Sequence, residues 1–285
     1  MKHTSTLPKT LRRAKKFPSY LFACLWAVIT IYPLVFTVLS SLKNNTEIFS
    51  DSALRLPQTL RFENYENALV VGNMARSLLN SIVIAGCATV VVLLLASMVG
   101  FAISRFNPKI TRFIYMFFTL GLLVPVHSTL VPLYKIVNQI KGPYDSYPVI
   151  IIIYATFNLP LAILIMTSGM RAISRSLDES AIIDGCGPFR VFGRIVLPLT
   201  LPSVSTVGII TFLYVYNDLL FAVLFISSKE NYTVTKAMQT FVGSKITTYG
   251  PIFASIIVAI IPMIVIYLLL QSKVEKGLAA GAIKG

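Results

Sequence analysis

Six long stretches of apolar residues alternate with more polar segments along this chain of 285 residues. Each stretch is long enough to cross roughly 30 Å of hydrocarbon, because an α-helix rises about 1.5 Å per residue. Prolines inside several of them suit helices that kink within a packed bundle. The pattern predicts an all-α polytopic membrane protein with six transmembrane helices, near residues 17–41, 80–104, 113–134, 147–170, 199–227 and 251–271.

The composition supports a membrane protein. Hydrophobic residues make up 55% of the chain, charged residues make up 13%, and the mean hydropathy is +0.77. These values exclude an ordinary soluble domain. No linker rich in Pro, Gly or Ser divides the sequence, so we expect one membrane domain over 17–271, with a basic tail at 1–16 and a second tail at 272–285.

The net charge of +14 is distributed in a way that indicates membrane topology. With the N-terminus in the cytoplasm, sixteen of the 25 Lys and Arg residues fall on the cytoplasmic side of the predicted spans. This is the positive-inside bias, and it predicts that both termini are cytoplasmic. We therefore expect the basic tail at 1–16 to face anionic membrane lipid and not nucleic acid.

The polar segment between the fourth and fifth apolar stretches carries signals for two short helices. Ser176-Leu177-Asp178-Glu179 reads as a capping box, so we expect a helix to start after Ser176, with both acidic side chains in its positive first turn. Gly185 and Gly187 should end that helix. A second helix should begin at Pro188 and continue until Pro198 bends the chain back towards the membrane.

The same segment contains Glu179-Ser180-Ala181, then Gly185 after three intervening residues, and Ile195-Val196-Leu197-Pro198 after nine more. This spacing resembles the EAA loop of ABC-importer permeases, with Ser180 in place of the first Ala. The resemblance implies that the loop at about 172–198 docks on an ATPase subunit. The docking residues that it implies are Ser176, Asp178, Glu179, Ser180, Ala181, Asp184, Gly185, Arg190 and Arg194.

Shorter matches extend the resemblance along nearly the whole chain, to the MalG-like permeases of carbohydrate ABC importers. They include Asn80-Ser81, Ser104-Arg105-Phe106 and Asn217-Asp218. The resemblance implies the type I importer permease fold (MetI-like) in the plasma (inner) membrane of a prokaryote. It also implies a heterodimer with a homologous sister permease, two ATP-binding subunits and an extracytoplasmic sugar-binding protein.

The glycine-rich C-terminus completes the resemblance, because in MalG-like proteins such a tail reaches into the ATPase interface. Its small residues would allow an extended backbone to lie in a narrow cleft. A frayed terminus is the alternative interpretation. The residues assigned to this coupling tail are Gly277, Gly281, Lys284 and Gly285.

Asp218 is an ionisable residue within the fifth apolar stretch, where a charge is costly unless it faces protein, water or a partner. We expect it to line the substrate pathway or its gate, although hydrogen bonds between packed helices would also explain such residues. No Lys or Arg lies at the centre of a predicted span, which favours a neutral, hydroxyl-rich solute. Further pathway candidates are Asn217, Tyr216, Tyr214, Asn158 and His127.

Motifs for catalysis are absent from the sequence. It contains no G-x-x-x-x-G-K-[ST] phosphate loop, no H-E-x-x-H and no G-x-S-x-G. We therefore expect a transport subunit without catalytic residues, metal or bound cofactor, with ATP and Mg held by the partner ATPase. The alternative is a secondary transporter or channel subunit that uses Asp218 as a proton or cation site.

Overall fold

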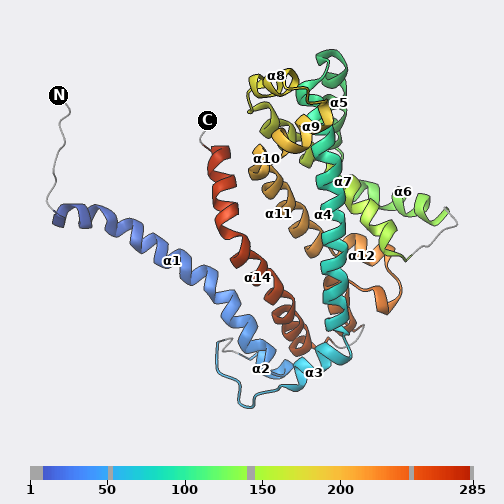
Figure 1. The fold of residues 1–285 in the computed structure, drawn as a ribbon. Helices are drawn as coiled ribbons and strands as arrows, with labels where there is room; N and C mark the ends of the chain where they lie inside the picture. Colours follow the sequence, from blue (N-terminus) through green and yellow to red (C-terminus); the bar gives the residue numbers. More distant parts are fainter. Residues whose placement is uncertain (1–8, 51–53, 140–144, 244–246, 283–285) are drawn as a thin grey trace. The chain divides into compact units, whose positions relative to one another are not determined.

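The computed structural model describes residues 9–50, 54–139, 145–243 and 247–282 (Figure 1). Within these ranges the regular elements are helices, and the only β-type pairing is an isolated bridge between Val242 and Thr247. The predicted all-α class is confirmed. The chain forms two compact units: Met1–Gly72 with Phe241–Val258, and Asn73–Thr240 with Ala259–Gly285.

Four of the described helices are long and apolar enough to cross a membrane singly. They are α4 and α7 in full and parts of the two terminal helices α1 and α14, over Pro18–Ser41 and Tyr249–Leu268. The full bounds are α1 Lys9–Ser41, α4 Met74–Arg105, α7 Tyr147–Arg171 and α14 Tyr249–Ala282.

The third predicted span is a bent pair and not one helix over 113–134. α5 (Pro108–Gly121) and α6 (Val126–Gln139) meet at 96°. Pro125 immediately precedes α6, and the residue before a proline is disfavoured in the helical region, so the helix stops short of it. A kink was expected at this proline, but the structure contains a complete break in the helix.

The fifth predicted span is also interrupted. The helical segment Pro188–Leu199 and α11 (Leu201–Asn217) form a second bent pair at 76°, and α11 stops before Asp218. The bend lies at Thr200 and not at Pro198 as predicted. The remaining elements are α2 Asn45–Ile48, α3 Glu63–Val70, α8 Arg175–Ile183, α9 Pro188–Val191, the π-helix Phe192–Val196, α10 Leu197–Leu199, α12 Leu220–Phe225, Lys229–Asn231, α13 Val234–Met238 and Gln239–Phe241.

Helices α4, α7 and α11 form the core of the second unit (Figure 1). Small residues allow α4 and α7 to approach closely: a Cβ added at Gly100 would lie 3.1 Å from the Met166 Cβ. Val92, Ala96 and Val207 are buried in the same apolar cluster. Close packing of this kind drives helix association where lipid removes the hydrophobic driving force.

Polar side chains organise the first unit around Asn64. Its amide nitrogen donates to the backbone oxygens of Ser41 and Lys43, both at 2.9 Å. Gly250 passes so close that an added Cβ would lie 2.5 Å from the Asn64 Nδ2. Asn45 accepts a hydrogen bond from the Tyr249 N–H at 2.9 Å. The loop after α1 is thereby tied to the start of α14.

Asn80 holds the beginning of α4 in the second unit. Its Nδ2 donates to the backbone oxygens of Glu230 at 2.8 Å and Tyr232 at 3.0 Å, and its Oδ1 accepts from the Tyr147 hydroxyl at 2.6 Å. Ser81 Oγ accepts from the Val234 N–H at 2.8 Å. The Asn80-Ser81 pair therefore joins the segment after α12 to α4.

The contact between α7 and α11 depends on the absence of a side chain at Gly169. An added Cβ would lie 2.9 Å from the Ser203 Cβ and 3.0 Å from the Thr200 Cγ2. Gly169→Ala should therefore destabilise the chain by about 1–3 kcal/mol, as overpacking does. Gly86→Ala is the matched control, because nothing lies within 4 Å of its added Cβ. Thermal unfolding of the purified chain in detergent measures both, and equal Tm values would contradict this packing.

Candidate functional site

The predicted docking loop begins at Ser174. This residue has extended backbone angles (φ −61°, ψ 137°), and its Oγ accepts the Ser176 N–H at 3.3 Å. The prediction of a capping box at Ser176 was wrong, because Ser176 lies inside the first turn and pairs through its own Oγ with that of Ser174 at 2.8 Å. Ser174 caps α8 instead, because the backbone is extended at this residue after α7 ends.

Asp178 is buried in an ion pair that the sequence reasoning missed. Arg105 Nε, at the end of α4, lies 2.5 Å from Asp178 Oδ2, and the side chains are only 8% and 12% exposed. The sequence analysis placed Asp178 in the positive first turn of a short helix and among the docking residues, without a partner on another helix. The available signal was Arg105 in the Ser104-Arg105-Phe106 triplet, because it is a cation at the predicted end of an apolar stretch and Asp178 is an anion in the next predicted cytoplasmic segment.

The Arg105 guanidinium also binds the end of α7. Its Nη1 donates to the Met170 oxygen at 3.1 Å, and its Nη2 donates to the Ile173 oxygen at 3.3 Å. Arg175, the first residue of α8, returns the contact by donating to the Ser104 oxygen at 3.0 Å. These bonds satisfy carbonyls that helix ends leave without partners. The docking loop is thus fixed to both α4 and α7.

Gly185 ends α8 in a Schellman motif. The Cys186 N–H donates to the Ala181 oxygen and the Gly185 N–H donates to the Ile182 oxygen, both at 2.9 Å. Gly185 has φ +80°, a left-handed conformation that favours glycine. The predicted glycine stop is therefore present, and α9 begins at Pro188, as expected.

Exposed apolar side chains lie on the facing ends of the two short helices, at the end of α8 and the start of α9. Ile182, Ile183 and Phe189 are 61%, 86% and 84% exposed. Ala181 is buried and packs beneath them in the core of the second unit. The other predicted docking residues are exposed, namely Ser176, Glu179, Ser180, Asp184, Gly185, Arg190 and Arg194. An exposed apolar surface rimmed by charges is typical of a protein contact.

A second polar cluster surrounds Asp218. Its Oδ2 accepts hydrogen bonds from the Tyr154 hydroxyl at 2.8 Å, the Phe221 N–H at 2.9 Å and the Ala222 N–H at 3.4 Å. Its backbone oxygen accepts from Thr235 Oγ1 at 2.6 Å. Asp218 is extended (φ −69°, ψ 135°) and lies in the break between α11 and α12, not within a helix as we had expected. The carboxylate caps α12.

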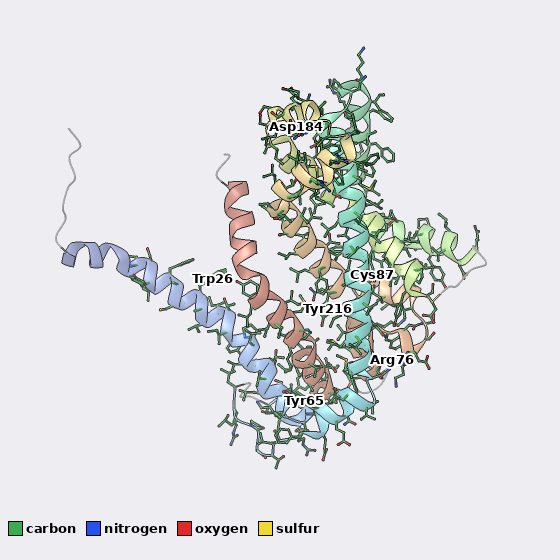
Figure 2. All side chains as sticks on the ribbon, in the orientation of Figure 1. Trp26, Tyr65, Arg76, Cys87, Asp184 and Tyr216 are labelled. Atoms are coloured by element: carbon green, nitrogen blue, oxygen red, sulfur yellow. The ribbon has the colours of Figure 1, made fainter. Side chains whose placement is uncertain are left out.

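The other pathway candidates are dispersed. Tyr216 is buried and donates to the Ala259 oxygen at 2.8 Å, and Asn158 donates to the Tyr154 oxygen at the same distance. Asn217 bonds within its own helix to Leu213, Tyr214 is 42% exposed, and His127 is exposed on α6. Only Asn158 is linked to the Asp218 cluster by a described hydrogen bond, through Tyr154. Tyr216 is the second-last residue of α11, and in Figure 2 it lies well away from Asp184 on the docking loop.

The C-terminal assignments are only partly within the described chain. α14 continues through Ala282, so the backbone from Gly277 to that point is helical and not extended as expected. Lys284 and Gly285 lie outside the described residues. Among the side chains that the structure describes, no group of three or more His, Cys, Asp or Glu could hold a metal ion.

A family model described as "Binding-protein-dependent transport system inner membrane component" matches residues 92–279. This range contains the docking loop and the Asp218 cluster. The chain belongs to this family. Together with the long apolar helices, that membership makes it a membrane permease component and confirms the resemblance drawn from the EAA loop.

Two curated relatives match almost from end to end. The diacetylchitobiose uptake system permease protein NgcG of Streptomyces coelicolor is 31% identical, over 93% of this chain and 88% of its own length. The trehalose transport system permease protein SugB of Mycobacterium tuberculosis is 32% identical, over 92% and 98%. Both relatives are sugar permeases by name.

A solved structure has the same fold. It is a chain of a bacterial ABC transporter that imports the acidic polysaccharide alginate, with a TM-score of 0.77 and 17% sequence identity. The match covers 94% of this chain and 99% of that one. At this identity, the comparison establishes the permease fold and nothing about the solute.

The Arg105–Asp178 pair should be strongly coupled because it is largely shielded from solvent. Arg105→Ala and Asp178→Ala should each cost about 3–5 kcal/mol, and the double variant should cost less than their sum. Arg61 and Glu63 are the control pair, 3.9 Å apart and 42% and 77% exposed, with an expected coupling below about 1 kcal/mol. Double-mutant cycles from unfolding of the purified chain measure both pairs, and equal couplings would contradict the anchoring role.

Proposed function

We propose that this chain is a transmembrane subunit of an ATP-binding cassette importer for a neutral sugar, a di- or oligosaccharide, in the plasma (inner) membrane of a prokaryote. The observation that carries this proposal concerns the part of the docking loop formed by α8 and α9, which we call the docking knob. It exposes Ile182, Ile183 and Phe189 in a chain of the permease family. The names of the two curated relatives support a sugar. The absence of Lys and Arg from the centres of the predicted spans supports a neutral one.

The same proposal assigns the partners. A homologous sister permease would complete the pathway, two ATP-binding subunits would hold ATP and Mg, and an extracytoplasmic binding protein would deliver the sugar. The charge distribution along the sequence supports cytoplasmic termini, and with that orientation the docking loop would lie on the same side as the ATPase. Residues from Gly277 onward would contribute to the ATPase contact.

The structure suggests how movement of the knob would reach the substrate region. The knob is bonded to α4 and α7 through Arg105 and Arg175. α7 then runs about 25 Å from Arg171 to Tyr154, which contacts Asp218. When the ATPase subunits close on ATP, the knob and these helices would move as a rigid body and alternate between inward-facing and outward-facing states.

Gly185→Leu tests the docking role of the loop. Leu at φ +80° costs about 1–2 kcal/mol of backbone strain and reshapes the knob, so ATP-dependent uptake should fall at least about tenfold. Gly185→Asn is the control, because Asn adopts this conformation readily and should retain most uptake. Uptake in proteoliposomes and copurification of the ATPase subunits are the measurements. Normal uptake by the Leu variant, with the ATPase bound, would remove the basis for this assignment.

Substitution of Asp218 distinguishes ATP-driven import from the alternative, a secondary transporter or channel subunit that uses Asp218 as a proton or cation site. Asp218→Asn keeps an oxygen that can cap α12, so the unfolding temperature and uptake should stay near those of the parent chain. Asp218→Leu removes the cap and should cost about 1 kcal/mol or more. If the Asn variant folds normally but loses uptake altogether, the ionised carboxylate is required and the cation-coupled function gains support.

A further inference from the structure

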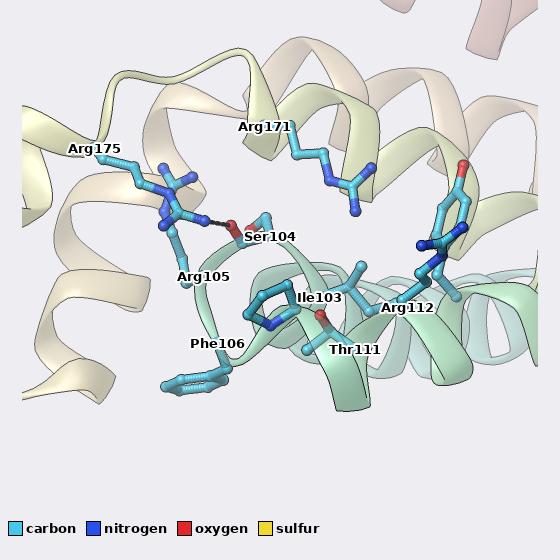
Figure 3. Close-up of a pocket in the computed structure, with 10 residues that line it drawn as sticks. Ile103, Ser104, Arg105, Phe106, Thr111, Arg112, Arg171 and Arg175 are labelled. Carbon is cyan, nitrogen blue, oxygen red and sulfur yellow. Dashed lines mark hydrogen bonds between the residues drawn. The ribbon is translucent and has the colours of Figure 1, made fainter.

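A basic cavity of about 590 Å³ lies where α4, α5, α7 and α8 end or begin, beside the docking loop. Four arginines line it: Arg105, Arg112, Arg171 and Arg175. Figure 3 shows Arg171 and Arg175 on one side of the space, with Thr111 and Arg112 on the other. No acidic residue of the described chain lines it. The side chains that line the cavity therefore carry positive charge and no negative charge.

Two of the four arginines are occupied by the protein. Arg105 binds Asp178 and the end of α7, and Arg175 donates to the Ser104 oxygen. These contacts account for the positions of both side chains. Asp178 neutralises the charge of Arg105, whereas the charge of Arg175 is not neutralised by its carbonyl partner.

The other two arginines have no comparable partner. Arg112 makes no hydrogen bond or ion pair with any described residue, and it lies in the second turn of α5. Arg171 is the last residue of α7, and its guanidinium lies over the Tyr115 ring, 5.2 Å from the centroid. A cation–π contact of this kind orients the guanidinium but leaves its N–H donors available. Both side chains can therefore donate to an anion in the cavity.

The position of the cavity favours a lipid. It lies at the ends of helices that span the membrane, where long basic side chains extend towards the headgroups. Apolar residues such as Ile103, Phe106 and Tyr115 line it beside the arginines. A ligand with a phosphate and an adjoining apolar part matches this mixed wall, and basic pockets between membrane helices are known to suit anionic headgroups.

We propose that this cavity binds the phosphodiester headgroup of an anionic phospholipid, held chiefly by Arg112 and Arg171. Arginine suits the role because its planar donors match two phosphate oxygens at once. The binding is a property of this chain and does not require transport. In the orientation proposed above the cavity would face the cytoplasmic leaflet, and the lipid binding itself does not depend on that orientation.

The test uses the full-length chain purified in detergent and incubated with dioleoyl phosphatidylglycerol or dioleoyl phosphatidylcholine. Bound lipid is counted by native mass spectrometry. We expect phosphatidylglycerol to be retained at least about tenfold better, and this preference to fall to near unity in Arg112→Gln/Arg171→Gln. Lys109→Gln is the control on the same helix, exposed and outside the cavity lining, and should keep the preference. Arg112→Gln alone should give an intermediate loss, and it removes no protein contact.

Two further measurements test whether a soluble anion or the ATPase subunit occupies the cavity instead of a lipid. If inorganic phosphate at equal concentration displaces phosphatidylglycerol, the site takes a soluble anion and the lipid assignment is wrong. If the double variant binds phosphatidylglycerol like the parent chain but no longer copurifies with the ATPase subunits, the arginines meet acidic side chains of that partner and the proposal fails. Loss of the lipid preference with unchanged copurification supports the lipid site and leaves the proposed transport function unaffected.

Discussion

Backbone N–H and C=O groups have no water to bind inside hydrocarbon, and this constraint governs where the chain can stop a helix. At two helix ends of the second unit, a side chain supplies the missing partner. Asp218 accepts the N–H groups at the start of α12, and Arg105 donates to the carbonyls at the end of α7. Asp218 and Arg105 are therefore polar residues placed at helix ends within an apolar chain. Their first role is to complete the backbone hydrogen bonding, and both candidate functional sites are built around them.

The sequence predicts which segments are helical better than it predicts the angles between successive helices. Hydropathy identifies each apolar stretch, and glycine and proline mark the two short helices of the docking loop. Hydropathy does not give the helix lengths, because the fifth stretch was predicted to reach 227 whereas α11 ends at Asn217. Hydropathy carries no information about direction, so α5 and α6 read as one span although they meet at 96°. Ser174 and Ser176 were both suitable caps. The choice between them depended on where α7 ended, which no local pattern specifies.

Contacts between distant residues were the least predictable part of the candidate site. Asp178 reads equally well as an exposed first-turn acid and as a buried partner, and only the position of α4 decides between them. The same holds for Asp218, whose acidity in an apolar stretch suggested transport chemistry, whereas its hydrogen bonds show a helix cap. One polar residue can serve both roles, since a cap in a broken helix leaves part of the carboxylate available.

The position of Arg105 in the chain has a consequence for biogenesis. Its partners Met170 and Ile173 follow it by 65 and 68 residues, and Asp178 comes later still. At a synthesis rate of 5–20 residues per second, the guanidinium remains unpaired for roughly 4–15 s after it is made. During that interval its full charge opposes passage of this end of α4 through the bilayer. In the proposed orientation, the residue that later fixes the docking loop would first act as a topology signal, and the two roles would follow one another in time.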